Sequence, residues 1–461
     1  MSCKAIVLAA GDGRRMKSAG QKVLRKVLGE PMLGWVLDSL AEAGIAPEDT
    51  GVVVGSGADA VKEYLGSRAE YRIFTQSGRK GTAHAVMQAA ELPENGDNVL
   101  VMPGDMPFVN CSTIIASLNE HTHSGSDITV ISAVLDDPAD GGRVVRGGDG
   151  SLESVAYPGD CTPGQLGITE IFTGLCWFRA EALKAALPKL SSDNSSGEYR
   201  LGDLAAAIRS NGGKAGVFRV SEPSIALGAD DRSDLLRLNI IAKMAVIGKL
   251  MSDGVEFVST DGIIIERGVR IGRDTVILPG TIIRGSAEIG EGCVIGPNSL
   301  IENCKIGNNV TLNNVQAYDS RVADRVKAGP FVQLRPGTVL HEGVKIGDFV
   351  EIKNSEIGVN TAVAHLTYLG DSDVGKGVNF GCGCVTANYD GVNKYRTTIG
   401  DYAFIGCNTN LIAPVEIGEN AATGAGSTIT SNVPADSLAL ERSKTRIIEH
   451  WEKNSQRKKK A

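Results

Sequence analysis

The sequence predicts two different folds in one chain: a doubly wound, Rossmann-like α/β domain and then a parallel β-helix. Apolar strand-like runs alternate with helical patterns in the first half, which is typical of an α/β sheet. In the second half an aliphatic residue followed by glycine recurs in steps of six, the period of a β-helix. These patterns divide the chain into a first domain at residues 1–230, a linker helix at 231–252, a β-helix at 253–430 and a C-terminal extension at 431–461.

The first domain opens with residues 4–10, an apolar run without polar alternation, as expected for a central parallel strand. Further strands are expected at residues 52–54, 99–102 and 128–131, and helices at residues 32–43 and 83–90. Ligands of such domains bind beyond the carboxyl ends of the strands. The loops that follow these strands are therefore the first place to look for a site.

The segment between the two domains, residues 231–252, has the apolar spacing of a single helix. Leu235, Leu238, Ala242 and Ala245 fall on one stripe of it. We expect this helix to connect the two domains.

The repeat of the second half is most regular near its end, where Ile399, Ile405, Leu411, Ile417 and Thr423 follow one another in steps of six. In a β-helix each group of six forms one short strand and a turn, with the aliphatic side chain pointing inward. We expect glycine at the corners, where φ can be positive. A glycine-rich β-sandwich would give irregular spacing, so the β-helix is the better interpretation.

The repeat is interrupted in several places. The step from Phe380 to Ile399 is 19 residues, one more than three sixes, so a loop must leave the coil there. That loop lies within residues 384–396, which are polar, aromatic and basic, and loops on rigid scaffolds commonly carry function. Steps of 11 follow Ile295 and Ile346, and a step of 17 follows Ile357; bulges or one-residue deletions would both explain them.

Composition favours a cytoplasmic enzyme. A net charge of −7 argues against a nucleic-acid-binding protein, and no apolar run approaches the ~18 residues of a membrane span. The chain enters its first strand at once, which leaves no room for a signal peptide. Nine scattered cysteines fit a reducing compartment. Cys382 and Cys384 have metal-like spacing but no second pair, so packing is the preferred interpretation.

The loop after the first strand has the composition of a phosphate site. Gly11 and Gly13 allow the backbone to approach a phosphate, and Arg15 and Lys22 supply positive charge for a polyphosphate. The dinucleotide fingerprint would need a third glycine where residues 14–16 stand. Asp105 follows another strand, at the edge of the sheet where a Mg²⁺ ligand is expected. The alternative is that Asp105 only caps a helix.

Residues 8–16 with Lys22, residues 81–85 and Gly104-Asp105 resemble the sugar-1-phosphate nucleotidyltransferases. Residues 335–337, 349–354, 365–371 and 388–391 sharpen the match. Together they resemble the bifunctional glucosamine-1-phosphate N-acetyltransferase and N-acetylglucosamine-1-phosphate uridylyltransferase family. The resemblance implies a nucleotidyltransferase domain before a left-handed parallel β-helix of hexapeptide repeats, and a homotrimer. It also implies acetyl-CoA and UTP as co-substrates, Mg²⁺ as cofactor, and synthesis of UDP-N-acetylglucosamine for the cell envelope.

The resemblance assigns the acetyl-transfer site. An amine must lose a proton before it attacks a thioester, and His365 is the implied base because imidazole titrates near neutral pH. Glu351 is the residue expected to orient it. The implied glucosamine-1-phosphate positions are Arg335, Lys353, Tyr368 and Asn379, and the implied acetyl-CoA positions are Cys382, Asn388, Tyr389, Lys394, Cys407, Ala425 and Arg442. Cys382 stands where alanine is common, and Cys407 where serine is common.

The resemblance also assigns the uridylyl site, with two departures. Arg15 and Lys22 are the implied catalytic cations, and Asp105 and Asp230 the implied metal ligands. The implied positions for UTP and the sugar phosphate are Leu8, Gly11, Gly13, Gln76, Gly81, Thr82, Gly142, Tyr157 and Phe172. Tyr157 stands where the family has a sugar-binding glutamate and Phe172 where it has an asparagine, so two polar sugar contacts are lost.

Three functions remain open on sequence alone. The leading one is the bifunctional enzyme. The second keeps the acetyltransferase but gives the first domain another sugar phosphate or weak activity. The third is a β-helical assembly protein whose first domain only senses nucleotide. His365 within its full motif argues against the third, because scaffolding needs no base.

Overall fold

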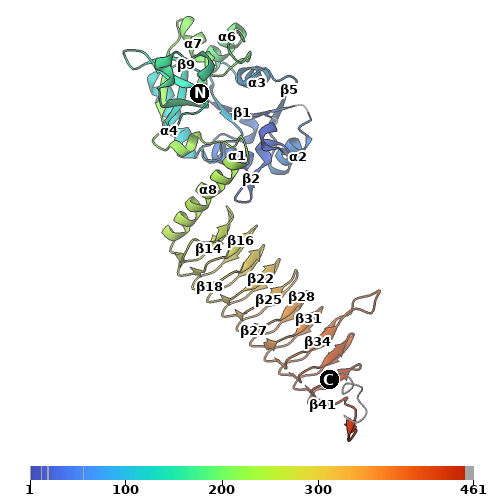
Figure 1. Cartoon of the computed structure of the whole chain (residues 1–461). Helices are drawn as coiled ribbons and strands as arrows, with labels where there is room; N and C mark the ends of the chain where they lie inside the picture. The colour runs from blue at the N-terminus through green and yellow to red at the C-terminus, as the bar shows by residue number, and fades with distance from the viewer. Residues whose placement is uncertain (1, 12, 18–19, 56, 452–461) are drawn as a thin grey trace, which may run out of the picture. The chain divides into compact units, whose positions relative to one another are not determined.

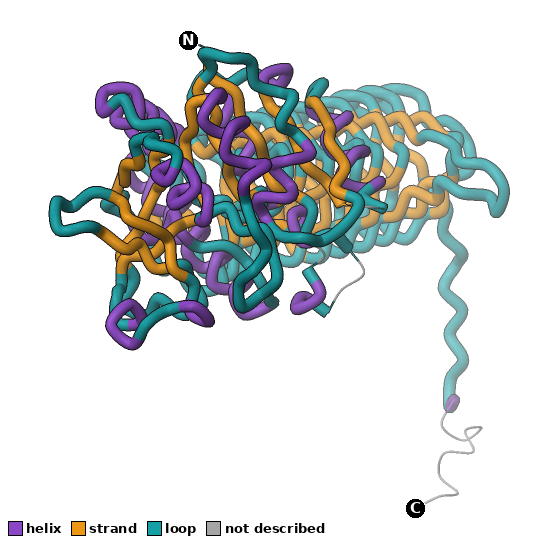
Figure 2. Tube along the Cα trace, turned by 90° about the horizontal axis from the view of Figure 1, so that it is seen from above, coloured by secondary structure: helices purple, strands orange, loops and turns teal. Residues whose placement is uncertain are grey.

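The computed structural model describes residues 2–11, 13–17, 20–55 and 57–451. It contains two compact units, Met1–Ala242 and Lys243–Ala461. The first unit combines helices with a mixed sheet, and the second consists of short stacked strands (Figures 1 and 2). None of the helices in the described ranges is both long and apolar enough to cross a membrane.

The sheet of the first unit has nine strands, seven of which lie in the order β11-β7-β10-β6-β1-β4-β5. β1, β4, β5 and β6 are parallel, and β10 runs antiparallel to both β6 and β7. A hairpin of β8 and β9 extends from β10. The strands are β1 Cys3–Ala9, β4 Thr50–Gly55, β5 Arg72–Gln76, β6 Asn98–Pro103, β7 Ile128–Val134, β8 Arg143–Arg146, β9 Leu152–Ala156, β10 Glu170–Arg179 and β11 Ala215–Arg219.

Apolar side chains cover both faces of this sheet. Val7 of β1 belongs to one buried cluster and the adjacent Ile6 to another, as expected for a central strand buried on both sides. The helices are α1 Met32–Glu42, α2 Asp59–Arg68, α3 Thr82–Gln88, α4 Cys111–Ser124, α5 Pro163–Leu166, α6 Ala180–Ala186 and α7 Asp203–Ser210. The predicted α/β fold is confirmed, with β10 as an antiparallel strand that its apolar sequence did not reveal.

The long helix α8 covers Arg232–Ser252. Leu238 and Ala242 are buried, but Ala245 is exposed, so the apolar stripe predicted for this helix is partly wrong. Ile247 and Leu250 are buried instead and join the core of the second unit.

The second unit is the predicted left-handed parallel β-helix. Its strands form three parallel sheets, which run from β12 (Glu256–Phe257) to β41 (Leu438–Ala439), from β13 (Ile264–Ile265) to β40 (Thr428–Ile429), and from β14 (Arg270–Ile271) to β38 (Val415–Ile417). Most strands point one aliphatic residue into a continuous core between the sheets. The strands that matter for function are β25 Val332–Leu334, β27 Lys345–Asp348, β28 Glu351–Lys353, β30 Ala362–His365, β31 Tyr368–Gly370, β33 Asn379–Phe380, β34 Val385–Ala387, β35 Thr397–Ile399 and β36 Phe404–Ile405.

The irregular steps of the repeat are one-residue deletions at one corner of the coil. Ile283 pairs with Ile301, 18 residues on, whereas Ile289 pairs with Ile306, only 17 on. The shortened corner contains Asn303, whose φ is +53°. Asn354 and Asp371 occupy the same corner of later coils with φ of +45° and +50°. The predicted loop is present too: residues 388–396 leave the coil between β34 and β35 and project from it (Figure 1).

The glycine of each repeat is required for a different reason from the one expected. Most of these glycines, Gly358 and Gly400 among them, do not have positive φ. A Cβ on Gly358 would lie 2.5 Å from the carbonyl carbon of Gly375, and one on Gly400 would lie 2.9 Å from that of Gly418. The next coil therefore comes too close for any side chain. Asparagine, which tolerates the left-handed region, occupies many of the positive-φ corners.

Candidate active sites

The first unit has a polar cavity at the carboxyl edge of its parallel strands. A space of about 600 Å³ is lined by Gly11, Gly13, Arg15, Lys22, Arg79, Glu198 and Asp230. A second space of about 280 Å³ shares Gly11, Arg79 and Glu198 with it and adds Leu8, Gln76, Gly81, Thr82 and Asp105. Most of the positions implied for UTP therefore surround one region. This is the edge at which doubly wound sheets bind their ligands.

Lys22 lies between two carboxylates in this cavity. Its Nζ is 2.5 Å from Asp105 Oδ2 and 2.5 Å from Asp230 Oδ1, and Arg15 Nη2 is 2.9 Å from Asp230 Oδ2. Burial alone would lower the pKa of Lys22, but the two carboxylates outweigh it and raise that pKa. Burial would likewise raise the pKa of Asp230, but Lys22 and Arg15 hold it below its ordinary value. Lys22 and Asp230 are thus both held in their charged forms before any ligand binds.

The loop between β5 and α3 shapes the other side of the cavity. Gln76 is buried, and its Nε2 donates to the carbonyl oxygen of Gly81 at 3.2 Å. Gly81 has φ of +103°, and a Cβ there would lie 2.4 Å from the carbonyl oxygen of Tyr199. Thr82 Oγ1 accepts from the backbone N–H of Leu201 at 2.9 Å. These contacts fix the position of the residue expected to recognise uracil.

Glu198 lines both parts of the cavity although the sequence pattern did not single it out. The neighbouring Tyr199 donates its N–H to Lys80 at 2.7 Å and accepts from Ala83 at 2.9 Å. These bonds bring residues more than a hundred positions apart to the same wall. No spacing signal in the sequence links the two segments.

Tyr157 and Phe172 line neither of these spaces. Phe172 is buried in a core cluster, and Tyr157 packs against that cluster. The guanidinium carbon of Arg200 lies 4.6 Å from the centre of the Tyr157 ring, and burial raises the pKa of this tyrosine. Gly142 lies against the same ring, because a Cβ there would be 3.2 Å from it. The two aromatic residues thus pack into an apolar cluster of the core.

The second unit brings an imidazole and a carboxylate together on adjacent coils. Nδ1 of His365, at the end of β30, lies 2.7 Å from Oδ1 of Asp348, at the end of β27. The two residues are register partners in the parallel pairing of these strands. Their side chains are 57% and 40% exposed, so the pair faces solvent in the single chain. The hydrogen bond to His365 lowers the pKa of Asp348.

The role expected for Glu351 differs from what the structure shows. Its Oε1 lies 2.7 Å from Nη1 of Arg335 on the preceding coil, rather than at His365. Glu351 begins β28, three residues after Asp348, and the corner between them turns the two side chains to different sheets. The carboxylate in contact with the imidazole is therefore Asp348, and Glu351 is in contact with Arg335.

Two cations implied for substrate binding lie next to each other. Lys353 ends β28, and Lys394 lies in the loop that leaves the coil after β34. The adjacent Lys394 is the main cause that lowers the pKa of Lys353. Two ammonium groups held together in this way favour an anion between them, as a phosphate would be.

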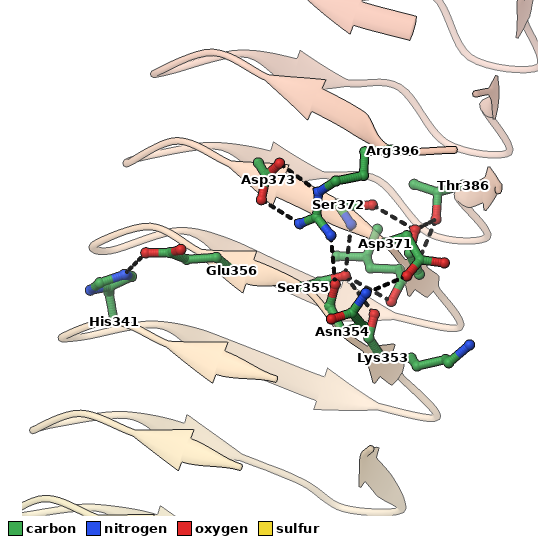
Figure 3. A network of polar contacts seen from close by, with 12 residues as sticks. His341, Lys353, Asn354, Ser355, Glu356, Asp371, Ser372, Asp373, Thr386 and Arg396 are labelled. Carbon is green, nitrogen blue, oxygen red and sulfur yellow. Dashed lines mark hydrogen bonds and ion pairs between the residues drawn. The ribbon is translucent and has the colours of Figure 1, made fainter. Parts of the chain in front are cut away.

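A polar network supports the loop that carries Lys394. Asp371 accepts hydrogen bonds from Asn354 Nδ2 at 2.5 Å and from Asn388 Nδ2. Burial would raise the pKa of Asp371, but these donors outweigh it and the pKa is lowered. Asn354 and Asp371 lie on neighbouring coils at the shortened corner (Figure 3). Tyr368 is close by, since a Cβ on Gly370 would lie 2.4 Å from its hydroxyl oxygen. The implied position Asn388 is therefore buried and structural as well as near the site.

Three positions implied for acetyl-CoA form one column on successive coils. The N–H of Asn408 donates to the carbonyl oxygen of Cys382 at 2.7 Å, and that of Gly426 donates to Cys407 at 2.8 Å. These bonds stack Cys382, Cys407 and Ala425 at one corner, and both Cys407 and Ala425 are exposed. Among the residues described, no group of three or more His, Cys, Asp or Glu side chains is arranged to hold a metal.

The remaining implied positions lie around these features. Asn379 is exposed on β33, next to Ala362 of β30. Tyr389 is exposed in the projecting loop, where it bridges to Lys394. Arg442 is exposed in the segment after β41, directly after Glu441, whose N–H donates to Ser427 Oγ at 3.1 Å.

Comparison with known proteins agrees with the two units. Residues 5–195 match the MobA-like NTP transferase domain family, and residues 268–303 and 396–431 match the bacterial transferase hexapeptide family of six repeats. The chain is similar to the bifunctional protein GlmU of Acetivibrio thermocellus, with 43% identity over 98% of this chain and 97% of that protein. It is also similar to those of Geobacillus thermodenitrificans (42% identity, 99% of both chains) and Heliobacterium modesticaldum (44% identity, 97% of both chains).

These relatives match this chain along nearly its whole length, and so across both units. The chain therefore belongs to the family of bifunctional GlmU proteins.

Proposed function

We propose that this protein acetylates glucosamine-1-phosphate with acetyl-CoA and then transfers UMP from UTP to the N-acetylglucosamine-1-phosphate that results. The observation that carries the proposal is the presence of two chemically different sites on two separate units of one chain. One is a charged cavity suited to a triphosphate, and the other is an imidazole held by a carboxylate on a hexapeptide coil.

The acetyl step needs a base. Because Nδ1 of His365 is engaged by Asp348, Nε2 is the ring nitrogen that takes the proton from the substrate amine. The amine nitrogen then forms a bond to the thioester carbon, the C–S bond breaks, and CoA leaves. The Lys353–Lys394 pair supplies charge for the sugar phosphate, together with Arg335, which pairs with Glu351.

The acetyl-CoA molecule is assigned to the corner column of Cys382, Cys407 and Ala425 and to Arg442. An exposed column of small side chains leaves room for a long cofactor arm along the stacked coils. Asn388 and Tyr389, in the loop after β34, are assigned to acetyl-CoA as well. The position of this column next to β33 places it close to the strand that carries His365.

The uridylyl step is an in-line attack of a sugar phosphate oxygen on the α-phosphate of UTP, with pyrophosphate as the leaving group. Arg15 and Lys22 balance the charge of the phosphates, while Gly11 and Gly13 allow the backbone to approach them. Little covalent chemistry falls to the protein in such a reaction, so positioning and electrostatics decide the rate.

Mg²⁺ fits the chain's residues. Asp105 and Asp230 already converge on one cation, the ammonium group of Lys22, and Mg²⁺ is usually held by one or two carboxylates together with water and substrate phosphates. When bound, the ion would neutralise the triphosphate. Asp230 stands where asparagine is common and remains a hard oxygen ligand.

We assign the protein to the cytoplasm, and we propose that it is a homotrimer whose acetyl-transfer sites lie between neighbouring chains. The exposure of His365 and Asp348 supports the second point, since a base that works on a thioester is better shielded from water.

One observation favours a second function for the first unit. Tyr157 and Phe172 pack into the apolar core, whereas the resemblance implies two polar sugar contacts at their positions. The alternative is that acetyl transfer is unchanged while the first unit prefers another sugar-1-phosphate or works slowly.

The test is an assay of purified protein with glucosamine-1-phosphate, acetyl-CoA, UTP and Mg²⁺ that follows free CoA and pyrophosphate separately. We expect CoA first and then pyrophosphate. Release of CoA without pyrophosphate would favour the alternative. Release of neither product would instead favour an assembly protein that senses nucleotide.

A further inference from the structure

We infer that Asp348 is the positioning residue for His365. Its carboxylate accepts a hydrogen bond from Nδ1–H, so that the unprotonated Nε2 of the imidazole faces the substrate amine. The inference rests on the proposed acetyl transfer and adds to it a residue that the motifs did not indicate.

The β-helix itself produces this pairing. His365 follows Asp348 by 17 residues, which is one shortened coil, and the pairing of β27 with β30 places the two residues side by side. Both residues end their strands just before the same corner, where Phe349 and Leu366 follow with φ of +57° and +45°. The side chains leave the coil together there, and Nδ1 and Oδ1 come to 2.7 Å.

The competing carboxylate is already engaged. Glu351 accepts from Arg335 at 2.7 Å and belongs to a different sheet from His365. The other groups packed against β30 do not compete with Asp348. On one side, β27 also carries Lys345, but this residue pairs with Ala362, three residues before His365. On the other side, β33 contributes Asn379 and Phe380, and the turn after β33 carries Cys382. Asp348 is thus the anion adjacent to the imidazole.

The carboxylate performs two tasks. It accepts from Nδ1–H and so fixes the tautomer in which Nε2 carries the lone pair. It also stabilises the imidazolium ion that forms when the amine gives up its proton. Because the hydrogen bond to His365 lowers the pKa of Asp348, the carboxylate is ionised over the pH range in which imidazole acts as a base.

The pair contributes little to folding, since ion pairs between exposed side chains add little to stability. Its loss should therefore appear in catalysis rather than in stability. The chain provides a matched control: Nε2 of His341 lies 2.6 Å from Oε1 of Glu356, a second imidazole–carboxylate pair, away from the substrate-binding residues (Figure 3).

The experiment compares Asp348→Ala, Asp348→Asn and the control Glu356→Gln in the full-length protein. For Asp348→Ala we expect kcat of CoA release to fall by ~10-fold or more, with the KM values for both substrates unchanged. Asp348→Asn, whose amide oxygen can still accept from Nδ1–H, should lose about threefold.

Glu356→Gln should leave kcat unchanged. Pyrophosphate release from N-acetylglucosamine-1-phosphate and UTP, measured in each variant, reports on folding of the other unit. If Asp348→Ala keeps kcat within twofold while His365→Ala is inactive, the positioning role is wrong and the acetyltransferase stands. If wild-type protein releases no CoA, the proposed function itself fails.

Discussion

The two sites of this chain differ in how their charges are held. In the first unit, Lys22 is mostly buried and its ammonium group lies between two carboxylates 125 residues apart in sequence, Asp105 and Asp230. In the second unit, the base and its carboxylate are 57% and 40% exposed and come from adjacent coils. The first site is a cavity whose charges are arranged before substrate arrives, whereas the second is an open surface in the single chain.

This difference follows from how the two architectures bring functional residues together. A doubly wound sheet collects residues from distant segments at one edge, so that one chain can enclose a ligand. A β-helix places residues one coil apart side by side, which gives exact registration along a face but no enclosure. Variants should therefore act within one chain at the first site and across chains at the second.

The largest effect should come from the first site. Asp105→Ala removes one of the two carboxylates on Lys22 and half of the proposed metal ligands, so we expect pyrophosphate release to fall by ~10³-fold or more. The release of CoA by the same protein should not change, which controls for folding. Parallel loss of both products would show that the two sites are not independent.

The next effect concerns the base. His365→Ala should depress kcat for CoA release by ~10²-fold or more and leave pyrophosphate release from supplied N-acetylglucosamine-1-phosphate intact. Steady-state assays of the two half-reactions measure this directly. Equal loss of both activities would indicate misfolding instead of a missing base.

A third effect tests whether the exposed site is shared. Chains carrying His365→Ala and chains carrying Arg442→Ala, each inactive in acetyl transfer, are mixed under conditions that exchange subunits. If neighbouring chains complete the site, part of the CoA release should return. Verified mixed trimers without any recovery would confine the site to one chain.

A smaller effect is expected at Tyr157 and Phe172 of the first unit. Tyr157→Glu with Phe172→Asn restores the polar pair, and Arg200, 4.6 Å from the Tyr157 ring, is available to the new carboxylate. The KM for N-acetylglucosamine-1-phosphate should fall by about threefold or more, at some loss of thermal stability because polar groups replace buried rings. An unchanged KM in a folded double variant would remove these positions from the sugar site.

The smallest effect is expected in the corner column. Cys407 is exposed where serine is common, and a thiol is a weaker hydrogen-bonding group than a hydroxyl. Cys407→Ser should lower the KM for acetyl-CoA by about twofold. Cys384→Ser serves as the contrast, because its buried thiol packs against the coil and should affect stability rather than KM.

Much of the fold could be predicted from period and apolar pattern. Steps of six identify the coil, and even the one-residue deletions are visible as steps of 11 and 17. The antiparallel direction of β10 could not be predicted, because a strand buried on both faces has no directional signal in its sequence. The role of the repeat glycines was predicted wrongly, since a close approach between coils is a property of the stack and not of one repeat.

The sites were predictable to the extent that their residues follow strands or belong to motifs. Gly11, Lys22 and Asp105 meet at one sheet edge as strand order requires. Glu198 was missed because only long-range pairing brings it to the cavity. Asp348 could have been found by stepping back one coil from His365, which is a geometric signal that the motif alone does not contain.

The central claim is that two independent sites act in sequence, and mixing two single-site variants tests it most directly. His365→Ala and Asp105→Ala proteins are each given glucosamine-1-phosphate, acetyl-CoA, UTP and Mg²⁺, separately and together, and the UDP-sugar is measured. Each variant alone should form almost none. The mixture should form it readily, because N-acetylglucosamine-1-phosphate made by the Asp105→Ala protein can diffuse to the His365→Ala protein. A mixture as inactive as its components, with both proteins folded, would contradict the account.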